Sequence, residues 1–129
     1  MDEKTTLEEL IQRLGQPRQW KGRRVRALRP LGEDRMLLEA VSRGEFLLNG
    51  FRNRDVQSRF FGAATPDRVE SRRRSAWVSR KLRLLRAHGL IRKVCGTYRY
   101  QLSQTGRKAI TALLTALRST IAEFIPEAA

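Results

Sequence analysis

The segment 71–88 constrains the fold of this chain more than any other segment, because only a narrow stripe of it is apolar. Val78, Leu82 and Leu85 recur at the spacing of one face of an α-helix, and arginine dominates the rest of the segment. A helix of this composition can bury only one side, so its guanidinium groups must face solvent or an acidic partner. The sequence therefore predicts a long helix over 71–88 that ends at Gly89.

The remaining apolar patterns predict a mainly α fold with a small β-hairpin. Helical spacing and terminal signals predict four further helices, over 6–14, 33–43, 52–61 and 104–124. Alternating apolar and polar residues in 98–102 predict a strand that pairs with 90–94 across a turn at 95–97. Residues 46–48 are expected to form a short strand or an extended connector.

Residues 16–30 differ from their surroundings, because they are strongly basic and show little helical periodicity. Pro17 and Pro30 bracket the segment, and Trp20 is its one large apolar side chain. We expect an extended basic arm that reaches a minor groove or follows phosphates. The alternative is a solvated linker with Trp20 packed on the domain. The cationic residues of the arm are Arg18, Lys21, Arg23, Arg24, Arg26 and Arg29.

The charge balance indicates a polyanionic partner. The chain has 27 Lys and Arg against 13 Asp and Glu, which gives a net charge of +14. Its 129 residues are enough for one compact domain. The chain shows neither a basic amphipathic helix with bulky apolar residues opposite nor an apolar run of about 20 residues, so no membrane partner is expected. One cysteine, Cys95, allows no internal disulfide, and the cytoplasm is the expected compartment.

The sequence offers no catalytic or metal-binding pattern. No phosphate-binding glycine motif or nucleophile–base set is present, and the acidic residues form no convincing catalytic group. With His88 as the only histidine and Cys95 distant from it, we expect no metal site and no cofactor. His88 is interpreted as a capping or surface histidine in the last turn of the 71–88 helix. We therefore expect a binding protein rather than an enzyme.

The predicted order is helix, short strand, helix, helix, hairpin and helix, and it is the order of a winged helix-turn-helix domain. Residues 78–91, VSRKLRLLRAHGLI, resemble the recognition-helix stretch of MarR- and ArsR-type regulators, with its V-S-x-x-L-x-x-L-x-x-x-G-L-I pattern. Residues 98–107, YRYQLSQTGR, resemble the second strand of the wing and the entry to the last helix. Residues 85–114 also resemble the C-terminal end of longer uncharacterised bacterial proteins that are associated with mobile elements. The connection 62–70 and the basic arm depart from the regulator pattern.

These patterns divide the chain into four parts: an N-terminal helix (1–15), the basic arm (16–30), a winged-helix domain (31–103) and a C-terminal helix (104–129). Side chains opposite the apolar stripe of 71–88 are candidates for contacting base edges. They are Ser79, Arg80, Arg83 and Trp77. Trp77 could instead pack beside the preceding helix. Arginines at the helix start and cations of the hairpin are candidates for phosphate contacts. They are Arg72, Arg73, Arg74, Arg92, Lys93 and Arg99.

The sequence thus predicts a double-stranded DNA-binding protein that acts in transcriptional regulation or on a mobile element. The long apolar stripe of 104–124 suggests a homodimer, and the alternative is that this helix packs back on the N-terminal helix. Two other functions remain open, namely an RNA-binding or ribonucleoprotein accessory protein and a protein-interaction adaptor. An adaptor would not need arginine over the whole outer arc of 71–88.

Overall fold

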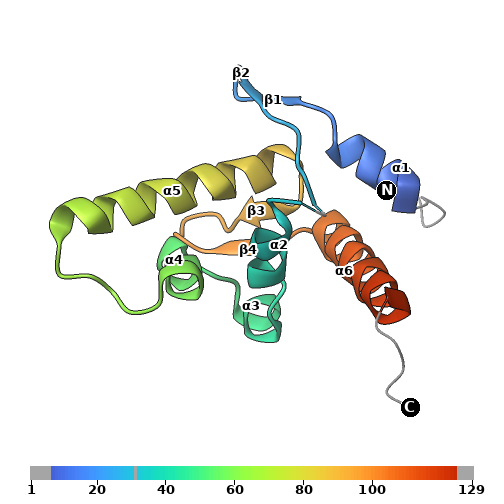
Figure 1. Cartoon of the computed structure of the whole chain (residues 1–129). Helices are drawn as coiled ribbons and strands as arrows, with labels where there is room; N and C mark the ends of the chain where they lie inside the picture. The colour runs from blue at the N-terminus through green and yellow to red at the C-terminus, as the bar shows by residue number, and fades with distance from the viewer. Residues whose placement is uncertain (1–6, 31, 125–129) are drawn as a thin grey trace, which may run out of the picture.

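The computed structural model of the chain describes residues 7–30 and 32–124, with side chains for 8–30 and 32–118, and is mainly helical (Figure 1). Two small antiparallel hairpins accompany six helices within this part of the chain. In chain order the elements are α1 (Leu7–Leu14), β1 (Arg18–Trp20), β2 (Arg23–Val25), α2 (Arg35–Val41), α3 (Gly44–Asn49), α4 (Asn53–Phe61), α5 (Arg68–Ala87), β3 (Ile91–Lys93), β4 (Tyr100–Leu102) and α6 (Gln104–Phe124).

Helix α5 confirms the orientation that the sequence predicts. Val78, Leu82 and Leu85 are buried in the core, where α5 packs mainly against α4. Leu84 is buried as well, on a flank that the first hairpin covers. The helix begins before residue 71, because the Asp67 carboxylate accepts the Val69 amide and caps its first turn. Burial of this stripe turns the arginines of α5 outward.

The predicted hairpin near the end of the chain is confirmed as β3 and β4. Ile91 pairs with Leu102 and Lys93 pairs with Tyr100. Phe51 extends this sheet by a single antiparallel bridge to Tyr100. The Phe51 amide donates to the Tyr100 carbonyl oxygen at 2.9 Å, and the Tyr100 amide donates to the Phe51 carbonyl oxygen at 2.7 Å. Gly50 precedes it with a φ of 73°, and a Cβ there would lie 2.6 Å from the Tyr100 carbonyl oxygen. The backbone can therefore approach β4 only with glycine at this position.

The strand or connector predicted at 46–48 is wrong, because these residues belong to helix α3. Phe46 is buried, Leu47 is half-buried and Leu48 is 82% exposed, so the apolar run does not lie on one side of a strand. Phe46 packs its ring against Phe51, with centroids 5.4 Å apart. The strand-like position lies after Gly50 instead, at Phe51.

The extended arm predicted at 16–30 is also wrong, because most of the segment forms the β1–β2 hairpin. Trp20 pairs with Arg23, and the two residues between them have positive φ values, 49° for Lys21 and 77° for Gly22. Two consecutive residues of this kind form a turn whose twist matches that of an antiparallel hairpin. The pair Lys21-Gly22 is the turn signal in the sequence.

A buried carboxylate attaches this hairpin to the helical core. The side chain of Asp34 is 1% exposed and accepts both terminal nitrogens of Arg26, at 2.8 and 2.9 Å, and the Arg29 amide at 2.7 Å. Burial by itself raises the pKa of Asp34, but these hydrogen bonds and the Arg26 charge outweigh burial and leave the pKa below its ordinary value. The carboxylate therefore stays ionised and holds the base of the hairpin.

The prediction that His88 caps the 71–88 helix is confirmed, because His88 is the C-cap residue of α5, but the alternative of a surface histidine is wrong. Its backbone caps the end of α5, but its side chain is 3% exposed and Nε2 lies 2.9 Å from the Arg26 carbonyl oxygen. Burial lowers the pKa of His88, more strongly than the bond to Arg26 raises it. Nε2–H of the neutral imidazole therefore donates to the hairpin segment.

Helix α6 packs back on the same chain. Ala109, Ile110 and Leu113 are buried, and the helix contacts α1 and α2 (Figure 1). Its first turn lies directly against the backbone of Leu90, and a Cβ at Gly106 would overlap the Leu90 carbonyl oxygen. This packing occupies the apolar stripe of the first half of α6, while the homodimer through 104–124 stays a prediction.

We expect Asp34→Asn to lower the free energy of unfolding by about 2 to 3 kcal/mol, because an amide can keep neither the bidentate ion pair nor all three accepted hydrogen bonds. Urea unfolding followed by circular dichroism measures the loss. Glu39→Gln is the matched control, because Glu39 is half-exposed and its partner Arg35 lies 3.7 Å away on the surface. Equal stability of the two variants would contradict the anchoring role of Asp34.

We also expect the protein to lose stability as the pH falls from about 8 to about 5.5. The pKa of His88 is lower in the folded chain than the ordinary 6.5, so the unfolded state binds a proton first and is favoured below that pH. Urea midpoints across this range measure the effect, and His88→Gln should flatten the profile. An unchanged profile in His88→Gln would contradict this assignment.

Candidate nucleic-acid interface

The outward face of α5 carries several exposed arginines. Arg72, Ala76, Ser79 and Arg83 follow one another along its centre and are all exposed. No residue from 68 to 77 is fully buried, so the first half of α5 projects beyond the core, toward the left in Figure 1. This half of the helix is accessible around most of its circumference.

The structure separates the four predicted base-contact residues into two groups. Ser79, Arg80 and Arg83 are exposed, and neither arginine makes an ion pair or hydrogen bond with another described residue. Trp77 packs instead, in edge-to-face contact with Phe60 and Phe61, at centroid distances of 5.0 and 5.5 Å. This is the packing alternative for Trp77, so its ring belongs to the seam between α4 and α5.

The three arginines predicted to hold phosphates at the start of α5 also differ from one another. Arg72 and Arg73 are exposed, and Arg73 has only a long contact of 3.8 Å with Glu70. Arg74 is 21% exposed, with Nε 3.2 Å from the Glu70 carboxylate and its guanidinium over the ring of Phe61. It also donates to the Ala63 carbonyl oxygen. Arg74 therefore braces α5 against the preceding loop, and its assignment as a phosphate contact stays a prediction.

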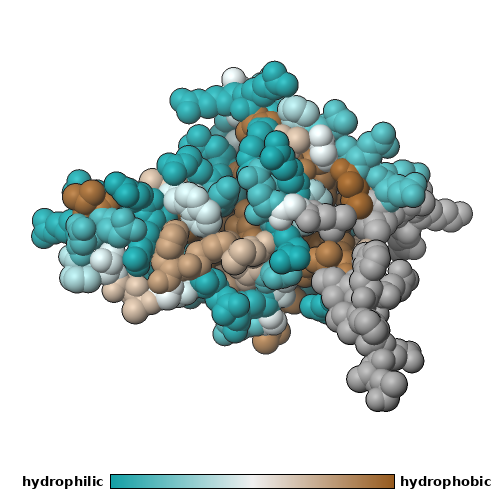
Figure 2. All heavy atoms as spheres, in the orientation of Figure 1, coloured by the Kyte–Doolittle hydropathy of each residue, from teal (hydrophilic) through white to brown (hydrophobic). Residues whose placement is uncertain are grey.

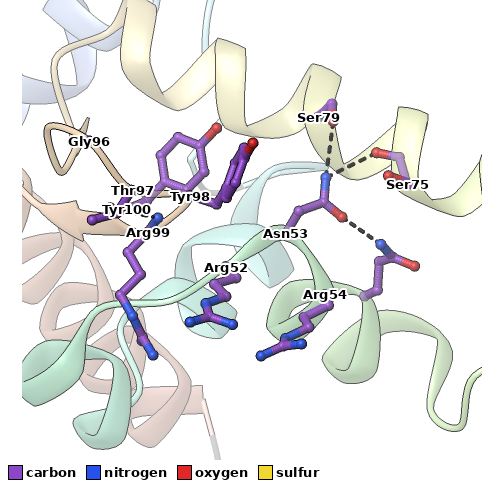
Figure 3. Close-up of a pocket in the computed structure, with 11 residues that line it drawn as sticks. Arg52, Asn53, Arg54, Ser75, Ser79, Gly96, Thr97, Tyr98, Arg99 and Tyr100 are labelled. Atoms are coloured by element: carbon purple, nitrogen blue, oxygen red, sulfur yellow. Dashed lines mark hydrogen bonds between the residues drawn. The ribbon is translucent and has the colours of Figure 1, made fainter.

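A hollow lies between α5, the start of α4 and the hairpin β3–β4 (Figure 3). Asn53 bridges the two helices at its floor, because its Nδ2 donates to the Ser75 carbonyl oxygen at 3.1 Å and to Ser79 Oγ at 3.0 Å. Tyr98 and Tyr100 form the wall on the hairpin side. The hollow has a volume of about 700 Å³, large enough for a segment of another molecule.

A second hollow continues from the first along α5. It shares Ser79 and Tyr100 with the first one and is lined beyond them by Trp20 of the first hairpin. The guanidinium of Arg86 lies over the Trp20 ring, 5.3 Å from its centroid. We call the two hollows together the basic trough. It runs along one flank of α5, from the start of α4 and the tip of β3–β4 to the β1–β2 hairpin.

The trough is lined by cations. Arg52, Arg54 and Arg99 line its first part, and the second part is lined by Lys21, Arg23, Arg83 and Arg86. Among the residues that the structure describes, no Asp or Glu lines either part. Seven like charges without a facing carboxylate produce a strongly positive potential in a concave surface, where the field is focused.

Sequence reasoning missed Arg52, Arg54 and Arg86. The first two stand at the start of α4, and Asp55 caps this helix by accepting the Arg52 amide at 2.7 Å. Cations are unfavourable at the positive end of a helix dipole, so two arginines there were a signal that an external anion is expected. Arg86 gave no such signal, because it lies in the last turn of α5, where cations are ordinary.

The predicted phosphate contacts of the second hairpin lie on both sides of its strands. Arg99 lines the trough and donates to the Asn49 carbonyl oxygen at 3.2 Å. Arg92 bonds to Gln101, and the Lys93 ammonium lies over the ring of Tyr98, 5.6 Å from its centroid. Arg92 and Lys93 are exposed on β3 but do not line the trough.

The arm cations divide into three groups. Arg26 and Arg29 face carboxylates: the Arg26 side chain binds the buried Asp34 and anchors the hairpin, whereas the Arg29 side chain makes an exposed ion pair with Glu33 at 3.2 Å. Lys21, Arg23 and Arg24 are exposed near the hairpin turn. Arg18 is half-buried in β1.

Comparison with known proteins gives no relative for this chain: no family model, curated protein or solved structure matches it. Within 7–30 and 32–124, no three His, Cys, Asp or Glu side chains gather in a way that could hold a metal ion. Among the helices that the structure describes, none is both long and apolar enough to cross a bilayer.

We expect Arg74→Ala to lower the free energy of unfolding by about 1 kcal/mol, because it removes a part-buried ion pair and a hydrogen bond to Ala63. Arg73→Ala is the matched control on the neighbouring position and should change stability by less than about 0.5 kcal/mol. Urea unfolding measures both values. A larger loss in Arg73→Ala than in Arg74→Ala would reverse the roles given to these two residues.

Proposed function

We propose that this protein binds double-stranded DNA with a winged-helix domain that places α5 in the major groove. The observation that carries the proposal is the outward arginine face of α5 beside a trough lined by seven cations and, among the described residues, no carboxylate. An acidic groove is the partner that complements such a surface. An α-helix also fits the width of the major groove of B-DNA, which is about 12 Å.

The order of the elements supports the winged-helix assignment. Helices α2 and α3 come first and are followed by Phe51, which pairs with β4 like a short strand. The packed helices α4 and α5 come next, and the hairpin β3–β4 comes after them. In a winged helix the second helix of such a pair enters the major groove, and the hairpin contacts the adjacent backbone or minor groove. Helix α5 and β3–β4 would have these two roles.

The trough fits one sugar–phosphate strand. A major groove and the adjacent minor groove are separated by a single strand, so this strand must pass between a helix in the first and a wing at the second. The space between α5 and β3–β4 is the first part of the trough. Arg52, Arg54 and Arg99 would neutralise its phosphates, together with the amide groups at the start of α4.

Base reading would fall to the middle of α5. Ser79 and Arg80 are exposed there, and arginine can pair bidentately with guanine. Arg72 and Arg73, one to two turns earlier, would hold phosphates. Duplex RNA is the weaker candidate, because its deep and narrow major groove does not admit a helix such as α5.

We expect Arg80→Ala to reduce the preference for selected sequences over random duplex by about 1 to 3 kcal/mol, because it removes a base-edge contact. Arg73→Ala should weaken binding to all sequences alike and lower the salt dependence. Fluorescence anisotropy with fragments selected from random duplexes measures both. Lys108→Ala, an exposed cation on α6, is the control for simple loss of charge.

The same titrations run with duplex RNA at equal salt separate the leading function from its alternative. Tighter binding of RNA than DNA would replace the proposal by an RNA-binding function. Absence of binding to either duplex at low salt would leave a protein-interaction adaptor. Equal, salt-insensitive losses in Arg80→Ala and Arg73→Ala would refute the division of roles.

A further inference from the structure

The β1–β2 hairpin lies against the C-terminal half of α5, on the side away from α4 (Figure 1). Trp20 makes the contact in β1, where its ring lies under the guanidinium of Arg86. In Figure 2 hydrophilic side chains cover this part of the molecule, at the top of the view. The hairpin therefore stands beside the outward face of α5 rather than behind it.

The base of the hairpin is fixed to the core by several bonds. Asp34 binds the Arg26 guanidinium and the Arg29 amide, and His88 binds the Arg26 carbonyl oxygen. Between them Leu28 is fully buried, and its amide donates to the Leu14 carbonyl oxygen at 2.8 Å. These contacts hold the hairpin in one orientation, so its tip has a defined place relative to α5.

The tip places like charges next to one another. On one side Lys21 and Arg23 line the trough with Arg83 and Arg86. On the other side Arg24 lines a separate concave space, outside the trough, together with Arg80 and Lys81. No Asp or Glu of the described chain lines either space, but Asp34 binds Arg26 of the separate space and attracts Lys81. Coulomb repulsion without a facing carboxylate therefore concerns the cations on the trough side of the tip. A polyanion between the tip and α5 would turn the repulsion into attraction.

We propose that the β1–β2 hairpin is a second phosphate-binding prong, which holds the DNA backbone at the end of the trough opposite the wing. Lys21 and Arg23 contact the phosphates, and Arg83, beside them, serves as a phosphate contact rather than a base reader. The inference rests on the proposed function, because it needs a duplex on α5. It limits base reading to the segment of α5 before Arg83 and lengthens the contacted stretch of DNA.

The test compares two charge-matched double variants, Lys21→Gln/Arg23→Gln at the hairpin tip and Lys108→Gln/Arg118→Gln on α6. All four residues are exposed, so neither variant should lose structure, which circular dichroism checks. Binding to a random duplex of about 30 base pairs, roughly three times the length of α5, is measured as a function of salt.

Two lost phosphate contacts lower the slope of log K against log salt by about 1.8, because each contact contributes about 0.9. We expect this change in the hairpin variant and none in the α6 variant. An unchanged slope in the hairpin variant, with wild-type binding intact, overturns the hairpin inference alone. A wild-type protein that fails to bind the duplex overturns the proposed function as well.

A cross-linking experiment tests the same placement without relying on affinity. The native thiol, Cys95, is exposed in the turn between β3 and β4. In the first sample a benzophenone label is attached to this thiol. In Cys95→Ser the label moves to Lys21→Cys, with Lys108→Cys as the control position. The labels at 95 and 21 should cross-link duplex DNA and the label at 108 should not. Cross-linking from position 21 at the control level counts against the inference.

Discussion

The outward orientation of the arginines depends on the burial of one stripe of α5. Val78, Leu82 and Leu85 occupy the core, and the helix cannot rotate without exposing them to water. Every cation of α5 then has its direction set by its position along the helix. The stripe ends where the core ends, so the first half of α5 extends into solvent with arginine on most sides.

The few carboxylates of the chain determine which cations are structural. Asp34 holds Arg26, and Glu70 holds Arg74, so these two guanidinium groups brace the hairpin and the start of α5. The cations that line the trough face no carboxylate within the described residues. With 13 acidic against 27 basic residues, neutralising every cation is impossible, and seven cations that face no carboxylate of the described residues line one flank of α5. An external polyanion would complete the electrostatic balance of that flank.

The sequence was sufficient where one side of an element is buried. The stripe of α5 and the alternation in 98–102 each have one solution, and both elements are present. It was insufficient at 46–48, where three apolar residues fit either a strand or a short helix. In the helix that forms, Phe46 is buried, Leu47 packs against the core and Leu48 is exposed. The hairpin at 18–25 escaped periodicity because its strands have three residues each and only one large apolar side chain.

The candidate site shows the same limit. Residues on α5 could be assigned to a face from their spacing, which is why Ser79, Arg80 and Arg83 were correctly placed on the exposed side. Spacing did not reveal the ion pair of Arg74, whose partner Glu70 lies one turn earlier and would compete with any external anion. The trough itself joins α4, α5 and both hairpins, so it depends on tertiary packing that no local pattern encodes.

The contact between Gly106 and Leu90 makes a stiff joint between α6 and the start of the β3–β4 hairpin. Ser103 reinforces it, because its amide and hydroxyl bond to the carbonyl oxygens of Leu90 and Gly89, at 3.0 and 2.6 Å. The backbone of Gly106 packs directly against the backbone of Leu90, with no flexible side chain between them. We therefore expect the end of α5, the β3–β4 hairpin and the start of α6 to move as one body, so that a partner that tilted α6 would carry the hairpin with it.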